Sequence, residues 1–283
     1  MDAGRTRGDG RQALADALDE EVRRHLLPPA AVDAIGVWLA GPGARYAAEG
    51  VGAHAVAYVP AHWSGAEPWL RGFAGREQTG AVRVSRARVT EAVRDAVGRG
   101  AWAEALVASY VWGQGRTGYG PHRLEAVLAE PGAEEALGAA VAELRERGAV
   151  AAYRGLRGTV RGLGPAFFTK FLYFLDLAEP APVGPRALVL DQRVARVVRA
   201  WAQRVGAAAG VASAAGTAAW TWSDGGWTAH RYAVYLELMS AARAQLADAG
   251  VGAPAAGVDL VELAFFQGVW DPLLRTEGPG RRA

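Results

Sequence analysis

Apolar residues recur every three or four positions along most of the chain, which is the spacing of an amphipathic helix. From Gln12 to Leu27, Leu14, Leu18 and Val22 fall on one side of such a helix, and acids and arginines take the rest. Similar spacing, bounded by prolines, glycines and capping residues, predicts further helices. They cover residues 29–38, 91–97, 102–112, 121–128, 133–147, 150–157, 165–177, 191–204, 228–249 and 258–273. The expected fold class is therefore all-α, or nearly so.

The helical pattern weakens in a few segments. Residues 43–79 are rich in glycine, alanine, proline and aromatic residues, which permits short strands or irregular loops. Residues 206–219 form a Gly/Ala run of low complexity. The basic termini, residues 1–11 and 275–283, are expected to be flexible tails. Thr90 is expected to be the N-cap of the helix that follows it.

Composition narrows the class of protein. With 283 residues, 51% of them hydrophobic and 21% charged, the chain can fold around one large core or two smaller ones. No apolar run approaches the roughly 18 residues that span a bilayer, and the first residues lack a signal-peptide pattern. We therefore expect a cytoplasmic protein with no membrane contact. The absence of cysteine excludes disulfides, thiolate metal sites and cysteine nucleophiles. A net charge of +2 permits nucleic-acid binding without demanding it.

The cationic residues are unusual, because the chain has thirty arginines but a single lysine, Lys170. On a solvated surface the two cations are close substitutes, but arginine stays protonated and cannot supply an uncharged amine nucleophile. Lys170 lies between Phe167 and Phe171, early in the predicted helix 165–177. Burial and the helix dipole both favour the neutral amine there. The alternative is that an arginine-rich composition left one lysine by chance. The neighbouring residues distinguish a functional lysine from an accidental one.

A glycine turn precedes this helix. Gly162 and Gly164 can adopt positive φ, and Pro165 suits the first position of a helix, so the turn joins two helices closely. This is the shape of a helix-hairpin-helix. Its backbone N–H groups, together with a nearby cation such as Arg161, suit a DNA phosphate. Ordinary helix corners use the same residues, so the turn alone does not distinguish a DNA-binding hairpin from a simple connection between helices.

A lone carboxylate, Asp191, follows an apolar run twenty-one residues beyond Lys170. An N-cap aspartate commonly stands at such a position and is worth about 1 kcal/mol. Taken together, the glycine turn, the lysine in the segment TKFLYF (169–174) and the aspartate in the segment LDQR (190–193) resemble the helix-hairpin-helix family of DNA glycosylases and AP lyases. The resemblance is strongest to its 8-oxoguanine glycosylase branch, including the archaeal type.

This resemblance implies a two-lobed helical fold with a cleft between the lobes. Residues 12–100 together with 205–274 would form one lobe, and residues 101–204 would form the lobe that carries the hairpin and the catalytic residues. The target base is flipped out of the stack, and Lys170 attacks the sugar C1′ or activates water to do so. Asp191 stabilises the positive charge that develops on the sugar. A Schiff base and loss of the 3′ phosphate would follow, with no metal and no other cofactor.

The resemblance also implies which residues contact DNA and the base. The segment 109–117 falls where family members carry a loop that wedges into the duplex, and an aromatic base pocket draws on the C-terminal helix. The aromatic residues of that helix are also typical core residues. The expected site residues are Lys170 and Asp191 for catalysis; Arg161, Gly162, Gly164, Gln114, Arg116 and Arg193 for DNA binding; Trp112, Asp259, Phe265 and Phe266 for the base pocket; and no metal ligand.

The register of the lysine, the function and the excised base each leave an alternative open. The common family hairpin reads LPGVG with the lysine two residues after the last glycine, whereas Lys170 lies six residues after Gly164. A non-catalytic helix-hairpin-helix DNA-binding protein is the second hypothesis. The excised base is 8-oxoguanine by resemblance, but a modified cytosine also fits the scaffold. In either case the expected partner is double-stranded DNA with a damaged or modified base, bound by a nucleoid-associated monomer.

Overall fold

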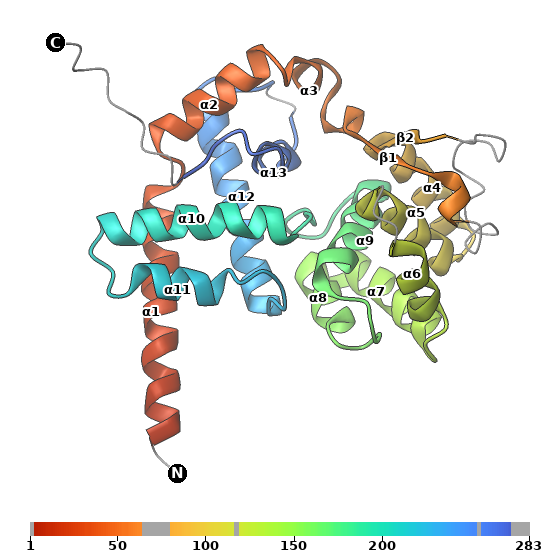
Figure 1. Cartoon of the computed structure of the whole chain (residues 1–283), viewed down its shortest axis with the longest axis horizontal. Coiled ribbons are helices and arrows are strands. Elements are labelled where there is room, and N and C mark those ends of the chain that lie inside the picture. Colours follow the sequence, from red (N-terminus) through yellow and green to blue (C-terminus); the bar gives the residue numbers. More distant parts are fainter. Residues whose placement is uncertain (1–2, 64–79, 116–118, 254–255, 273–283) are drawn as a thin grey trace.

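The computed structural model describes residues 3–63, 80–115, 119–253 and 256–272, and it describes side chains from residue 10 onward. Within these ranges the chain forms α-helices, short 3-10 segments and a two-stranded sheet (Figure 1). The elements are α1 Ala3–His25, α2 Pro29–Ala40, α3 Ala44–Glu49, η1 Val51–Ala53, β1 Ala55–Tyr58, β2 Val82–Ser85, α4 Arg86–Gly98, α5 Trp102–Gln114, α6 Gly120–Leu128, α7 Ala133–Arg147, α8 Ala149–Leu156, α9 Pro165–Ala178, α10 Gln192–Ala208, α11 Ala214–Thr221, α12 Ala229–Asp248 and α13 Asp259–Phe266. The expectation of a mostly α-helical fold is confirmed. None of the described helices has both the length and the apolar character that a membrane span requires.

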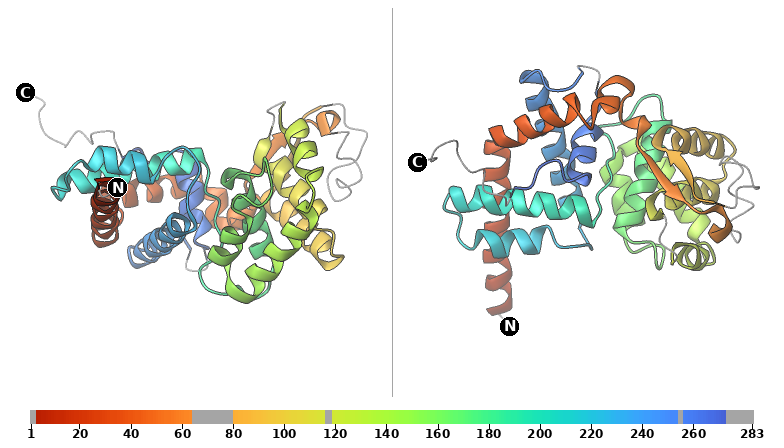
Figure 2. Two further views of the ribbon diagram at one scale, coloured as in Figure 1. Left: turned by 90° about the horizontal axis from the view of Figure 1, so that it is seen from below. Right: turned by 45° about the horizontal axis from the view of Figure 1, so that its top comes forward.

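Two groups of elements lie next to each other in all three views (Figures 1 and 2). In one group α10 contacts α1 and α11, and α12 also contacts α1. In the other, α9 contacts α4, α5, α7 and α8. The groups meet where α8 packs against α12, and the chain crosses between them in the link from α9 to α10. The lobe boundaries expected at residues 100 and 204 stay a prediction.

Most helices begin and end close to their predicted positions, because prolines, glycines and capping residues mark their ends. Helix α7 coincides with the predicted range 133–147. Helix α1 begins at Ala3, nine residues before the expected start at Gln12. Helix α11 begins within the Gly/Ala run, where composition gave no periodic signal, and ends two residues beyond it.

The start of α4 corrects one prediction. Ser85, not Thr90, is the N-cap, and its hydroxyl accepts a hydrogen bond from the backbone N–H of Arg88. Thr90 lies inside the helix, where its hydroxyl donates to the carbonyl of Arg86. Ser85 also ends β2, which pairs antiparallel with β1 with Ala55 opposite Ser85. The strand therefore passes directly into α4, which is why the helix starts earlier than the apolar spacing predicted.

A buried ion pair ties α12 to α1. Nη1 of Arg231 lies 2.6 Å and 2.7 Å from the two carboxylate oxygens of Asp19, and both side chains are less than 10% exposed. The Arg231 guanidinium also lies 4.9 Å from the ring centre of buried Trp222. Burial raises the pKa of Asp19, although Arg231 opposes that change. The Asp19 carboxylate therefore neutralises the charge of Arg231 inside this interface.

Replacing that carboxylate should strongly destabilise the fold. In Asp19→Ala the Arg231 charge stays buried without its partner, which costs about 3–5 kcal/mol in other proteins. Denaturant unfolding followed by circular dichroism measures the loss. Asp16→Ala, which removes an exposed carboxylate one turn earlier on α1, is the control and should change the free energy of unfolding by less than about 0.5 kcal/mol. Equal stability of the two variants would contradict the prediction.

Candidate active site

Lys170 lies in the second turn of α9. Gly164 is the N-cap, with φ −82° and ψ 165°, and Pro165 takes the first helical position. The Lys170 side chain is 7% exposed. Its amine donates to the carbonyl of Ala166 and lies 5.4 Å from the ring centre of Phe167. The lysine is therefore buried, as the sequence predicts, and its amine contacts a backbone carbonyl near an aromatic ring.

Gly113 on α5 leaves room for the stem of this lysine. A Cβ at Gly113 would lie 2.3 Å from Cδ and 2.9 Å from Cε of Lys170, so a larger residue would displace the amine. The preceding residue, Trp112, is buried and meets Phe174 edge-on, with 5.2 Å between ring centres. Phe174 lies one turn beyond Lys170 on α9. Close packing of α5 on α9 thus fixes the path of the lysine side chain.

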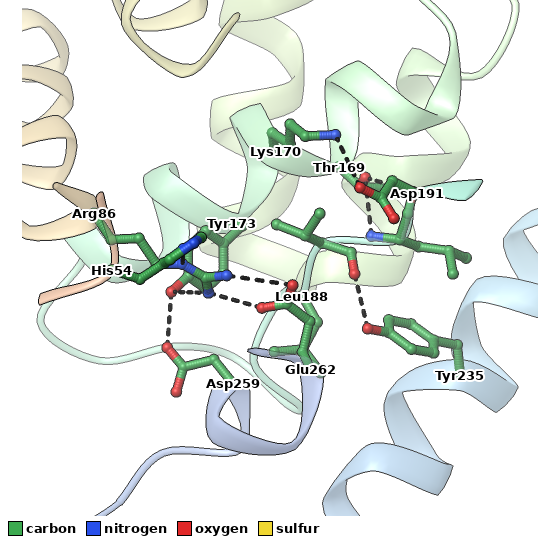
Figure 3. Close-up of polar contacts among 12 residues, drawn as sticks. His54, Arg86, Thr169, Lys170, Tyr173, Leu188, Asp191, Tyr235, Asp259 and Glu262 are labelled. Carbon is green, nitrogen blue, oxygen red and sulfur yellow. Dashed lines mark hydrogen bonds and ion pairs between the residues drawn. The ribbon is translucent and has the colours of Figure 1, made fainter. Parts of the chain in front are cut away.

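Asp191 is the N-cap of α10 and also the partner of the amine. Its Oδ1 accepts hydrogen bonds from the backbone N–H groups of Arg193 (2.9 Å) and Val194 (3.1 Å). Its Oδ2 lies 3.9 Å from Nζ of Lys170, and the two side chains point toward each other (Figure 3). The capping role and the catalytic role looked like alternatives in the sequence. In the structure one carboxylate oxygen caps the helix and the other faces the amine.

A buried segment, residues 187–190, places Asp191 at this point. On the α9 side, the Thr169 hydroxyl accepts a hydrogen bond from the last N–H of the segment, at 3.2 Å. On the α12 side, the Tyr232 hydroxyl donates to the carbonyl of Leu188 at 2.9 Å. The Tyr235 hydroxyl donates to the carbonyl of Val189 at 2.7 Å (Figure 3). Buried backbone groups need such partners. The segment is therefore fixed between two helices immediately before the carboxylate.

The surroundings favour the neutral form of the lysine amine. Burial lowers the pKa of Lys170, because the ammonium loses hydration. The carboxylates of Asp191 and Glu262 act in the opposite direction, and the positive charge of Arg86 adds to the lowering. The net direction is downward. A larger share of the amine than in an ordinary lysine is therefore in the form that attacks carbon.

The glycine turn before α9 has left-handed backbone at one of its two glycines. Gly162 has φ +83°, whereas Gly164 is extended. The N–H of Leu163 donates to the carbonyl of Val160 at 3.2 Å and closes the turn. Arg161 and Gly162 are exposed. The turn is thus present and open to solvent, and its contact with DNA stays a prediction.

A buried polar network begins one turn along α9 from Lys170 (Figure 3). Arg86 is 1% exposed, pairs with Glu262 at 2.7 Å and donates to the hydroxyl of Tyr173 at 3.0 Å. The Tyr173 hydroxyl donates to Asp259 at 2.8 Å, and Nδ1 of His54 accepts from Arg86 at 3.3 Å. Burial, followed by the charge of Arg86, lowers the pKa of His54 to about 3, so this imidazole is neutral at physiological pH.

Neither Arg86 nor His54 is among the site residues that the sequence predicts. A signal for Arg86 existed: it lies three residues before Val89 and seven before Val93, which places it on the buried face of α4. An arginine at such a position is normally interpreted as solvated, because burying its charge requires a carboxylate partner. That partner, Glu262, comes from a helix 176 residues away. No local pattern connects the two.

Two of the expected pocket residues meet at the His54 ring. Trp112 and Phe266 approach it edge-on, at 5.6 Å and 5.8 Å between ring centres. The guanidinium of Arg193 lies 5.2 Å from the Phe266 ring centre. Phe265, in contrast, is 1% exposed and contacts Trp201 and Trp270 in the core, so the structure does not bring it to this group.

The expected wedge residues are described only in part. Gln114 ends α5, and a Cβ at Gly120 would lie 2.2 Å from its Cγ, so the two segments are in close contact. Arg116 lies outside the described residues. The wedge role of both stays a prediction. In the described part of the chain, no three His, Asp or Glu side chains gather in a way that could hold a metal ion.

Because Lys170 is the only lysine, its ionisation can be measured selectively. The rate of arylation by 1-fluoro-2,4-dinitrobenzene, a reagent that does not itself titrate, followed by peptide mass spectrometry, should rise with pH around a midpoint below that of the same lysine in guanidinium-unfolded protein. Asp191→Asn should lower the midpoint further, since the carboxylate stabilises the ammonium. Asparagine is also a good N-cap, so α10 is retained. A folded-state midpoint at or above the unfolded one would contradict the inferred electrostatics.

Comparison with known proteins places the chain in a family. The model of the family described as "Putative 8-oxoguanine DNA glycosylase OGG-like protein" matches residues 49–266. This range includes the glycine turn, Lys170, Asp191 and the Arg86 network. No curated protein and no solved structure gives a significant match. The matched range covers more than half of the chain and agrees with the resemblance carried by the lysine and aspartate segments, so the chain belongs to this OGG-like family.

Proposed function

We propose that the protein is a DNA glycosylase with AP lyase activity that works through a Schiff base on Lys170. One observation carries the proposal: the only lysine is buried, with a lowered pKa, and its amine lies 3.9 Å from the carboxylate of Asp191. An amine and a carboxylate in this arrangement can attack and stabilise a reacting sugar carbon. Arginine in place of Lys170 would fill similar space without the chemistry.

The proposed reaction begins with the target nucleotide flipped out of the duplex. The lone pair of the Lys170 amine forms a bond to C1′ as the glycosidic bond breaks and the base departs with its electron pair. Asp191 stabilises the positive charge on the sugar and accepts the amine proton. Opening of the sugar ring, with the proton on Asp191 passing to O4′, then gives a protonated imine between Lys170 and C1′. Removal of a C2′ proton expels the 3′ phosphate, and water releases the lysine.

The base pocket is proposed to lie around Trp112 and Phe266, next to this centre. Both rings contact neutral His54, so the pocket offers aromatic surface without a free positive charge on the imidazole. Asp259 and Glu262 are held by Tyr173 and Arg86 in the free protein. They are therefore proposed to shape the pocket rather than to read the base directly.

The proposed target is an oxidised purine such as 8-oxoguanine in double-stranded DNA, in agreement with the family to which the chain belongs. A modified cytosine is the alternative target, because pocket chemistry can change on a constant scaffold. The chain is proposed to act as a monomer in the nucleoid, with no metal, since the amine supplies the nucleophile. A non-catalytic DNA-binding protein is the competing function, but it gives no reason for a buried lysine beside a carboxylate.

Borohydride reduction should trap the wild-type protein covalently on a duplex with an abasic site or with 8-oxoguanine opposite cytosine. Lys170→Arg should abolish trapping, because a guanidinium forms no imine, and should change the Kd for the duplex less than about threefold. Gel electrophoresis measures the covalent product. The double variant Lys170→Arg, Arg88→Lys moves the single lysine to an exposed position and should stay inactive.

A panel of duplexes with single defined lesions then identifies the base. Trapping on abasic DNA without excision of any oxidised purine would overturn the purine assignment and leave the lyase intact. Failure to trap wild type on every duplex, with DNA binding preserved, would favour the non-catalytic function.

Gly113→Ala should separate folding from catalysis. The added methyl group meets Cδ of Lys170, and a flexible side chain can move aside, so Tm should change little while the amine is displaced. Misplacement of a reacting group by about 1 Å commonly costs on the order of 100-fold in rate. Single-turnover trapping kinetics measure the effect. Gly155→Ala on α8, where a Cβ would meet no atom within 4 Å, is the matched control and should retain the wild-type rate.

A further inference from the structure

A cluster of polar side chains on α10 takes no part in the reaction described above. Gln192, Arg196 and Arg199 all donate to the carboxylate of Asp224, which lies in the loop between α11 and α12. The shortest N···O distances are 2.7 Å from Gln192, 2.6 Å from Arg196 and 3.2 Å from Arg199. A second nitrogen of Arg196 lies 3.3 Å from the other oxygen. One carboxylate thus receives four hydrogen bonds from one helix.

The position of the cluster relates it to the candidate active site. Positions 192, 196 and 199 follow at intervals of four and three, so they share one face of α10. The first of them directly follows Asp191, whose carboxylate lies 3.9 Å from the Lys170 amine. The cluster therefore begins at the reaction centre and extends about two helical turns away from it.

The chemistry of the cluster matches a phosphate group. Arginine and glutamine N–H groups that bind two carboxylate oxygens can bind two phosphate oxygens in the same way. The hydrogen bond from Arg196, followed by that from Gln192, holds the pKa of Asp224 well below its usual range, so Asp224 is ionised. The Asp224 side chain is 41% exposed and that of Arg196 is 54% exposed. An incoming anion can therefore reach the cations without unfolding the helix.

The loop that carries Asp224 also contacts the segment before the hairpin. Nε of Arg157, at the end of α8, donates to the carbonyl of Trp227 at 2.9 Å, and its Nη2 donates to the carbonyl of Gly226 at 3.3 Å. The loop thus touches α8, which leads into the glycine turn, as well as α10. Arg161 and Arg193 are exposed, one on that turn and one next to Gln192. Asp224 is an acidic group inserted among these basic positions.

We propose that Gln192, Arg196 and Arg199 form a binding site for a backbone phosphate of duplex DNA, and that Asp224 occupies this site in the free protein. The identity of the partner as DNA rests on the proposed function. Asp224 acts as an internal competitor that a phosphate must displace. Non-specific DNA affinity is thereby lowered, and the arginines become available when bound DNA brings a phosphate up to α10.

Asp224→Asn tests the proposal, because it removes the competing charge and keeps the shape of the side chain. Binding is measured by fluorescence anisotropy over a range of salt concentrations. The probe is a duplex with a tetrahydrofuran abasic analogue, which forms no Schiff base. We expect affinity at low salt to rise about 3- to 10-fold, and the slope of log K against log salt to steepen by up to about 0.9. Arg196→Ala in the Asp224→Asn background should reverse both changes.

Asp95→Asn is the matched control. Asp95 lies on α4 and forms an exposed ion pair with Arg99. The substitution removes the same negative charge and so measures the effect of net charge alone, and we expect it to change DNA affinity less than about twofold. If Asp224→Asn binds no better than Asp95→Asn, or only lowers Tm, the ion pairs merely tie the loop to α10 and the proposal is wrong.

The result is independent of the lyase chemistry. Tighter binding by Asp224→Asn together with failed trapping of wild type would support the phosphate site and overturn the proposed lyase activity. Successful trapping of wild type with unchanged binding by Asp224→Asn would support the lyase activity and overturn the phosphate site.

Discussion

The candidate site depends on how residues 187–190 are held between α9 and α12. The segment is buried, so its backbone groups must find partners within the protein. Thr169 provides one from α9, and Tyr232 and Tyr235 provide others from α12. Because Thr169 is the direct neighbour of Lys170, and Asp191 directly follows the segment, the hydrogen bonds that fix the backbone also fix the amine relative to the carboxylate.

The buried charges around Lys170 oppose one another. Arg86 lowers the pKa of the lysine, and its partner Glu262 raises it, while burial dominates both. Because the arginine and the glutamate are paired at 2.7 Å, their long-range effects on the amine largely cancel. Asp191 is the one carboxylate placed within 4 Å of the amine in the part of the chain described here. The site can thus contain several charges and still leave one carboxylate beside the amine.

The sequence predicted the features that depend on local chemistry, and it failed where the determinant lies far along the chain. The limits of α7 and α9 follow from glycines and prolines beside them, and the buried lysine follows from the phenylalanines around it. Ser85 replaced Thr90 as a cap because β2, which pairs with a strand 27 residues earlier, passes directly into the helix. The Arg86–Glu262 pair joins residues 176 positions apart. A single sequence contains no information about such a pairing unless both partners also carry a local signal.

The spacing between the hairpin and the lysine has a physical consequence. Lys170 lies four residues later than the common family pattern places it, which adds one turn, or about 5–6 Å, between the glycine turn and the amine. The amine still meets Asp191, because its position is set by the contact of Thr169 with the segment before Asp191 rather than by its distance from Gly164. A phosphate held at the glycine turn would then lie farther from the reacting sugar. In the proposed complex with DNA, the cations that begin directly after Asp191, on α10, would hold the backbone closer to the amine.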